Sequence, residues 1–197
     1  YTDLETSVFN ALEFVTENPG GLTTKGMELE LAWVASDKVR MNLGYTYSDA
    51  EFTDYITACP PSIEIQGAAA IAATCNAPGS VPAEPLYQAK GDQLPGAPRN
   101  TVTGGIEFVQ PIGALVFDAN ANYYYRDEVP NSAGDTLTIH PDYQIVNLGF
   151  GIGAEDRSWR VGAFARNVFD ERFHAGLLAT PFTGPGGVMN WHTRDGR

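Results

Sequence analysis

The sequence predicts an all-β fold, an antiparallel transmembrane β-barrel segment, and three observations lead to this prediction. Apolar and polar residues alternate along the chain, the strands that this pattern defines are long, and short and long connections follow one another in strict alternation. Side chains that alternate with a period of two are typical of a β-strand with two unlike faces. Strands of about ten residues are long enough to cross a bilayer while tilted.

The clearest strand lies at residues 39–48, which read VRMNLGYTYS. Every second residue is apolar or aromatic: Val39, Met41, Leu43, Tyr45 and Tyr47. The residues between them are polar or small. The same pattern predicts further strands at 26–34, 101–109, 115–126, 143–152 and 159–166, and a less regular first strand from Tyr1 to about Phe9, which makes seven in all.

The connections between these strands favour a membrane barrel over a soluble sheet. Short turns are predicted at 34–38, 110–114 and 154–158, and long stretches at 10–24, 53–97, 128–141 and after 174. Long loops are uncommon in compact soluble domains, whereas outer-membrane barrels have short periplasmic turns and long extracellular loops. Trp33 and Trp159 adjoin short turns, and the tyrosines of 45–47 and 123–125 lie toward long loops, as in two aromatic girdles.

A β-sandwich is the alternative, with the apolar faces packed against each other inside a soluble domain. Its weakness is the long polar face of 115–126, which carries Asp118, Asn120, Asn122 and Arg126. Such a face is natural in a water-filled barrel lumen.

Composition excludes several other classes. The chain has 12 Lys plus Arg and 24 Asp plus Glu, a net charge of −12, so we expect no nucleic-acid partner. The longest run of small apolar residues, 67–73, is too short for a transmembrane helix, and we expect no secretory signal peptide within residues 1–197. Because residue 1 is Tyr and falls within a predicted strand, we expect the chain to begin partway through a larger protein.

The two cysteines, Cys59 and Cys75, lie in one predicted loop of a chain that has no other cysteine. An even pair of this kind fits a disulfide formed in an oxidising compartment. The alternative is a pair of unpaired thiols in a cytosolic loop.

The candidate ligand contacts are the arginines of the predicted lumenal face, Arg126, Arg160 and Arg166, together with Tyr124. Arginine binds carboxylates and similar anions through two parallel hydrogen bonds, so this set could guide an anionic ligand. The favoured alternative is internal pairing with the lumenal acids Asp118, Glu28 or Glu107.

The remaining candidates are weaker. The histidines, His140, His174 and His192, match no metal-ligand spacing and are interpreted as solvated loop residues. The aromatic residues Trp191, Phe182 and Tyr143 could stack on a ligand ring, but such residues more often pack loops together. We find no catalytic motif and expect no enzyme activity, no metal and no cofactor.

Four segments together resemble the TonB-dependent outer-membrane receptors. These are 23–33 (TTKGMELELAW), 39–52 (VRMNLGYTYSDAEF), 94–108 (LPGAPRNTVTGGIEF) and 159–173 (WRVGAFARNVFDERF). The last is the most specific, because Asn167, Phe169 and Asp170 occupy the positions of a family signature near the penultimate strand. We interpret this signature as structural, with Asp170 accepting backbone N–H groups where the strand ends.

The resemblance implies a barrel of about 22 strands around an N-terminal plug, in the outer membrane of a Gram-negative bacterium. It implies uptake of a scarce nutrient, such as a ferric siderophore, another chelate or an oligosaccharide, powered by the TonB complex through an N-terminal TonB box. The expected surroundings are outer-membrane lipid and lipopolysaccharide. Residues 1–197 would be the C-terminal part of the barrel domain, without plug, TonB box or last strand. A passive porin and a soluble binding module remain the alternative functions.

Overall fold

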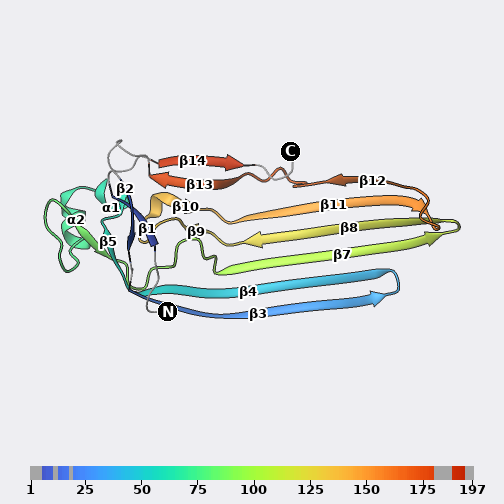
Figure 1. Ribbon diagram of the computed structural model, residues 1–197, viewed down its shortest axis with the longest axis horizontal. Coiled ribbons are helices and arrows are strands. Elements are labelled where there is room, and N and C mark those ends of the chain that lie inside the picture. Colours follow the sequence, from blue (N-terminus) through green and yellow to red (C-terminus); the bar gives the residue numbers. More distant parts are fainter. Residues whose placement is uncertain (1–5, 11–12, 18–19, 180–187, 194–197) are drawn as a thin grey trace.

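The main element of the fold is a six-stranded antiparallel sheet with the strand order β12-β11-β8-β7-β4-β3 (Figure 1). It is seen in a computed structural model that describes residues 6–10, 13–17, 20–179 and 188–193. The strands are β3 (Gly21–Ser36), β4 (Val39–Asp54), β7 (Asn100–Ile112), β8 (Leu115–Arg126), β11 (Tyr143–Ala154) and β12 (Arg160–Ala165). Each pairs with the next along the chain, so six of the seven strands expected from the sequence are confirmed in one meander.

Five of the six strands are longer than a bilayer requires, and β12, with 6 residues, is the exception. β3 and β4 have 16 residues each, and β8 and β11 have 12. At about 3.4 Å per residue these strands are roughly 40 to 54 Å long, whereas about 9–11 residues suffice to cross a membrane. β3 and β4 extend past the predicted bounds because their outer ends, at Leu22 and Phe52, are buried against the long connections.

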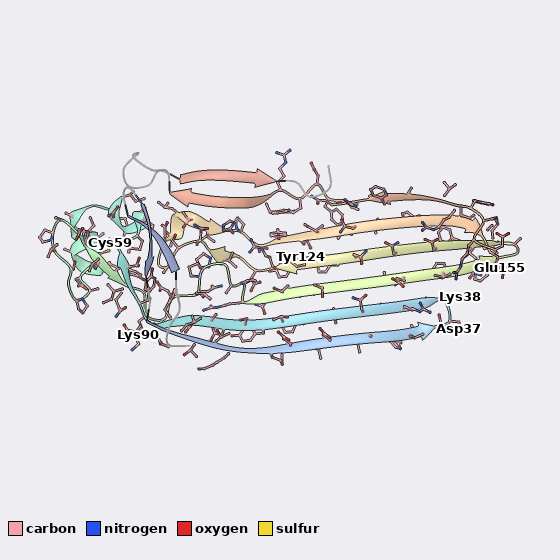
Figure 2. The ribbon with its side chains drawn as sticks, in the orientation of Figure 1. Asp37, Lys38, Cys59, Lys90, Tyr124 and Glu155 are labelled. Atoms are coloured by element: carbon pink, nitrogen blue, oxygen red, sulfur yellow. A yellow bond between two sulfur atoms is a disulfide. The ribbon has the colours of Figure 1, made fainter. Side chains whose placement is uncertain are left out.

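Short turns and long connections lie at opposite ends of the sheet, as predicted. Figure 2 shows Asp37, Lys38 and Glu155 together at the end with the short turns. Cys59 and Lys90 lie at the other end, within the long connection between β4 and β7.

The long connections contain more regular structure than the sequence suggested. The connection between β4 and β7 holds β5 (Ile56–Ala58), α1 (Pro61–Glu64), α2 (Ala68–Thr74) and β6 (Leu86–Gln88). The connection between β8 and β11 holds β9 (Val129–Pro130), a 3-10 helix η1 (Thr136–Thr138) and β10 (Ile139–His140). Elements of two to seven residues are too short to show a reliable period in sequence. No helix of the described chain is long and apolar enough to cross a membrane.

The two connections share a small hydrophobic core. It comprises Leu22, Phe52, Tyr55, Ala89 and Ala133, with Tyr87 and Leu94 packed against it. The Tyr87 ring lies directly on Gly134, where φ is +67° and any Cβ would clash with the ring. A disulfide joins Cys59, just after β5, to Cys75, at the end of α2, with Cα atoms 5.5 Å apart. Both cysteines are buried.

The expected first strand is only partly correct. Residues 6–10 form β1, but this strand pairs with β2 (Glu13–Glu17) in a separate two-stranded sheet and not with β3. A local hairpin closes a short loop, which costs less chain entropy than a distant pairing. At the other end, β13 (Phe173–Ala179) pairs with β14 (Val188–Thr193) in a stretch that the sequence left irregular. Phe182 and residues 196–197 lie outside the described residues.

One acid in the loop region predicts a pH dependence. Burial raises the pKa of the Asp92 carboxyl, which the hydrogen bond from Tyr87 only partly offsets, and burial with the same contact raises the pKa of Tyr87 to about 12. A raised acid pKa means that the folded loop binds the proton more tightly than the unfolded chain does. Asp92 therefore stabilises the loop most below its unfolded pKa of about 3.9, and this contribution is lost as the pH rises through the folded pKa.

Asp92→Asn is therefore expected to slow hydrogen exchange across residues 86–99 at pH 7 relative to the wild type. At pH 4, the variant and the wild type should exchange at nearly the same rate. Asp37→Asn, in the exposed turn at the far end of the sheet, is the matched control and should leave the exchange rate of residues 86–99 unchanged at both pH values. Faster exchange in Asp92→Asn at pH 7 would contradict the assignment.

Candidate functional site

The sheet has one apolar and one polar face, and the strand register fixes which residues share each. Leu31, Leu43, Gly104, Tyr123 and Val146 are directly paired across five strands in one apolar row. Nothing in the described chain packs on this face, since the side chains of Leu31 and Leu43 are 53% and 42% exposed. A β-sandwich would bury such a face, so the described chain is not one.

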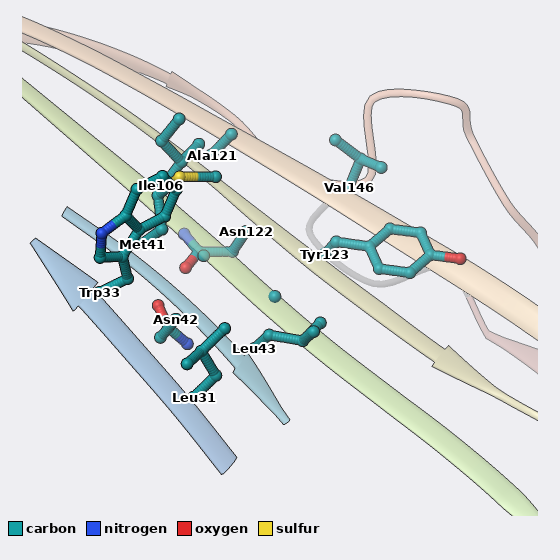
Figure 3. Close-up of a pocket in the computed structure, with 12 residues that line it drawn as sticks. Leu31, Trp33, Met41, Asn42, Leu43, Ile106, Ala121, Asn122, Tyr123 and Val146 are labelled. Carbon is teal, nitrogen blue, oxygen red and sulfur yellow. The ribbon is translucent and has the colours of Figure 1, made fainter. Parts of the chain in front are cut away.

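A groove of about 390 Å³ runs across this apolar face (Figure 3). Trp33, Met41, Ile106 and Tyr123 are among its walls. Gly104 and Ala121, whose side chains are small or absent, also line it. A lining of this kind suits hydrocarbon and not a charged or heavily hydrated ligand.

The aromatic residues of the apolar face lie in two bands, as the sequence predicted. Trp33 and Trp159 lie near the short turns, whereas Tyr45 and Tyr125 lie toward the loops. The Tyr45 hydroxyl donates a hydrogen bond of 2.7 Å to Asn100 Oδ1. The Tyr125 hydroxyl donates one of 2.9 Å to Asp127 Oδ1. Aromatic rings with one apolar and one hydrogen-bonded end are typical of a membrane interface.

The opposite face is polar and carries the residues expected to face a lumen. Asn42, Gly105, Asn122 and Asn147 form one directly paired row across it. A depression of about 480 Å³ lies beside this row and includes Asn120, Asn122, Asn147, Arg160 and Arg166 in its lining. Uncharged amides and arginines together can hold water or a polar partner, but not an apolar one.

Arg160 is engaged within this polar face. Its Nε donates a hydrogen bond of 3.0 Å to Asp118 Oδ1, and its second guanidinium nitrogen donates to Asp118 Oδ2. The pair crosses β11 above Gly151, where a Cβ would clash with both side chains. The alternative of internal pairing therefore holds for Arg160, with Asp118 as its partner.

Arg166 lines the same depression as Arg160, whereas Arg126 lies elsewhere on the face. The Arg166 guanidinium carbon lies 5.4 Å from the centre of the Phe164 ring. The Arg126 guanidinium carbon lies 4.9 Å from the centre of the Tyr143 ring. Arg126 and Arg160 pair with Tyr143 and Gly153, ten residues apart along β11 (153 − 143), so they are separated by about 34 Å. The predicted arginines therefore do not form a single site.

The structure does bring together Arg126, Tyr124 and Tyr143 at the loop end of the sheet. Figure 2 shows Tyr124 where the strands approach the loop region. The rings of Tyr124 and Tyr143 are 5.8 Å apart, and Tyr143 stacks on Phe173 at 4.4 Å between ring centres. Sequence reasoning placed Tyr143 near the loops but did not connect it with Arg126, because residues 127–142 separate them along the chain.

The residues of the family signature form a sharp bend after β12. Asn167 is 6% exposed with φ of +47°, and its side chain donates to Glu171 O and accepts from Glu171 N, both at 2.8 Å. Its own N–H donates to Asn147 Oδ1 at 2.9 Å. Phe169 is 68% exposed, and Asp170 has φ of +53° with its N–H donating to Asn167 O. Through these contacts the side chain of Asn167 closes the bend, and the acceptor role expected of Asp170 stays a prediction.

Asn167→Ala is expected to destabilise the protein by about 2 kcal/mol. It removes both side-chain hydrogen bonds to Glu171 and leaves alanine with a positive φ, which asparagine tolerates better. Denaturant unfolding of the full-length protein measures the change, and Phe169→Ala, at the exposed position of the same bend, is the control. Equal effects of the two changes would contradict this role of Asn167.

Within the described residues, no group of three or more His, Cys, Asp or Glu could hold a metal ion. His140 lies in β10 near Arg126 and Tyr143. His174 and His192 are register partners in β13 and β14. Trp191 lies in the same hairpin.

Comparison with known proteins connects this geometry to a family. The family model described as TonB dependent receptor-like, beta-barrel matches residues 1–168. Among curated protein sequences, none matches the chain.

Three solved structures share the fold. The ferric yersiniabactin uptake receptor FyuA from Yersinia pestis matches with a TM-score of 0.64 and 13% identity, over 91% of this chain and 23% of that one. BauA, the ferric preacinetobactin receptor from Acinetobacter baumannii, matches with a TM-score of 0.57 and 14% identity, over 96% of this chain and 24% of that one. The siderophore receptor PiuA from Acinetobacter baumannii matches with a TM-score of 0.56 and 18% identity, over 96% of this chain and 22% of that one.

The chain thus spans less than a quarter of the length of each of these receptors. The family model covers residues 1–168, which is most of the length of this chain. The chain belongs to the TonB-dependent receptor-like β-barrel family.

Proposed function

We propose that this chain forms part of the barrel wall of an outer-membrane receptor for TonB-dependent uptake of a ferric siderophore or similar iron chelate in a Gram-negative bacterium. The observation that carries the proposal is a meander of long strands with an exposed apolar face on one side and an asparagine-lined face on the other. Such a sheet is stable where lipid lies on one side and a wet lumen on the other.

The choice of ligand is supported by the three similar structures, each of which is a receptor for a siderophore or its ferric complex. In the proposed mechanism the loops joined by the core around Phe52 first capture the chelate. The polar face of β8, β11 and β12 then lines its path. The plug and the contact with TonB belong to parts of the receptor outside this chain. Lipid and lipopolysaccharide would surround the apolar face. This role involves transport without catalysis.

The test is iron-limited growth of a strain that lacks the gene, supplied with a panel of iron-loaded siderophores. Growth on at least one chelate should be lost on deletion and restored by the full-length gene. Restoration should fail in a strain without active TonB. Growth that the full-length gene restores without TonB would instead indicate a passive porin, and unchanged growth on every chelate would contradict the proposed ligand class.

A further inference from the structure

Arg126 lies at the loop end of the polar face and has no acidic partner among the described residues. Within the described residues it forms no salt bridge, and its buried Nε has no hydrogen-bond partner. The guanidinium lies over the Tyr143 ring instead. A buried charged donor without an acceptor is costly, so its retention calls for an explanation.

Within the described residues, neither Glu128 nor Asp142 forms a salt bridge with Arg126, and two other acids near it in the sequence are engaged elsewhere. Asp127 accepts hydrogen bonds from the Tyr125 hydroxyl and from Asn100 Nδ2. Asp135 accepts from Ser62 N and from the Thr138 hydroxyl. In a chain with a net charge of −12, an arginine left uncompensated among so many acids is available to an anion from outside.

A pocket of about 350 Å³ opens beside this arginine. Arg126, Tyr143, Phe173, His140, Asn131 and Gly96 are among the residues that line it. Tyr143 and Phe173 are stacked with only 12° between their planes, and the guanidinium lies over the Tyr143 ring, so the rings offer their edges as an aromatic wall beside Arg126. A guanidinium offers paired donors to a carboxylate, and an aromatic wall offers a surface to a flat ring.

We propose that this pocket binds an aryl carboxylate, with the carboxylate on Arg126 and the ring against Tyr143 and Phe173. The volume is within the range of small-molecule sites, and the pocket lies at the end of the sheet that carries the long connections. The inference rests on the proposed function only in that this end then faces the medium from which a chelate arrives. A ligand with an aromatic acid at its periphery would be held there first.

The experiment uses 4-fluorobenzoate as the probe and the full-length receptor in detergent micelles, with ¹⁹F NMR line broadening as the measurement and empty micelles as the blank. The wild type should broaden the signal, and Arg126→Gln should weaken binding about tenfold or more. Arg40→Gln, which removes an arginine near the short turns, should leave binding unchanged. Arg126→Lys keeps the positive charge but loses the paired N–H donors of the guanidinium, so an intermediate affinity is expected.

Equal broadening by the wild type and Arg126→Gln would overturn the inference, as would equal binding of 4-fluorobenzylamine, which has the opposite charge. Heat-modified mobility on a gel shows whether each variant is folded. If Arg126→Gln does not fold, Arg126→Lys takes its place as the test of the site. The two proposals fail separately. Siderophore-dependent growth without Arg126-dependent benzoate binding overturns only the pocket, whereas benzoate binding without such growth overturns only the proposed uptake.

Discussion

Leu43→Arg is expected to destabilise the folded barrel by about 2–4 kcal/mol, the cost of arginine on a lipid-facing strand near the bilayer midplane. Leu43 lies on the apolar face of β4 between Leu31 and Gly104, and its side chain is 42% exposed. No acid shares that row, so the new charge would have no partner in hydrocarbon. Denaturant unfolding of the full-length protein in phospholipid vesicles measures the effect.

Asn42→Arg is the matched control, because it places the same side chain one residue away on the polar face. It is expected to change stability by less than about 1 kcal/mol, since arginine there remains hydrated. If Asn42→Arg were the more damaging change, the assignment of the two faces would be inverted.

Asp135→Ala is expected to loosen both long connections at once, at a cost of about 3 kcal/mol to their packing. The Asp135 carboxylate is 3% exposed and accepts hydrogen bonds from Ser62 N at 3.3 Å, Leu137 N at 3.1 Å and the Thr138 hydroxyl at 2.9 Å. Ser62 belongs to α1, so this one acid links the β4–β7 connection to the β8–β11 connection. Removing the acid leaves buried donors without an acceptor.

Hydrogen exchange measures this second effect, and both α1 and η1 should exchange faster in Asp135→Ala than in the wild type. Asp37→Ala, which removes an acid from a short turn at the other end of the sheet, should leave both segments unchanged. Faster exchange in η1 alone would mean that the two connections open independently, contrary to the expected link.

The six strands of the main sheet could be predicted from the sequence because each has unlike faces and most are long. A period of two over eight or more residues, as at 39–48, is difficult to produce by any other structure. Once the short turns are placed, the register of each hairpin follows, and with it the two faces. The loop elements could not be predicted, since β9 and β10 have two residues each and depend on contacts with distant residues.

The candidate site was predictable only in part. Sequence reasoning placed Arg126, Arg160 and Arg166 on one face, and the register confirms this for Arg126 and Arg160. It could not tell which arginine is paired, because the pairing of Arg160 with Asp118 depends on the close approach of two strands across Gly151. The link between Ser62 and Asp135 joins residues 73 positions apart, and no local pattern marks it.

The most direct test of the central claim is the accessibility of spin labels at residues 40–43 of the full-length protein in vesicles. Single cysteines would replace Arg40, Met41, Asn42 and Leu43 in turn. No free cysteine competes within the described chain, where Cys59 and Cys75 form a disulfide. Collision with oxygen, which partitions into lipid, should be high at 41 and 43 and low at 40 and 42, with a water-soluble nickel chelate giving the opposite order. An inverted order, or no alternation, would contradict a barrel wall with its apolar face in the membrane.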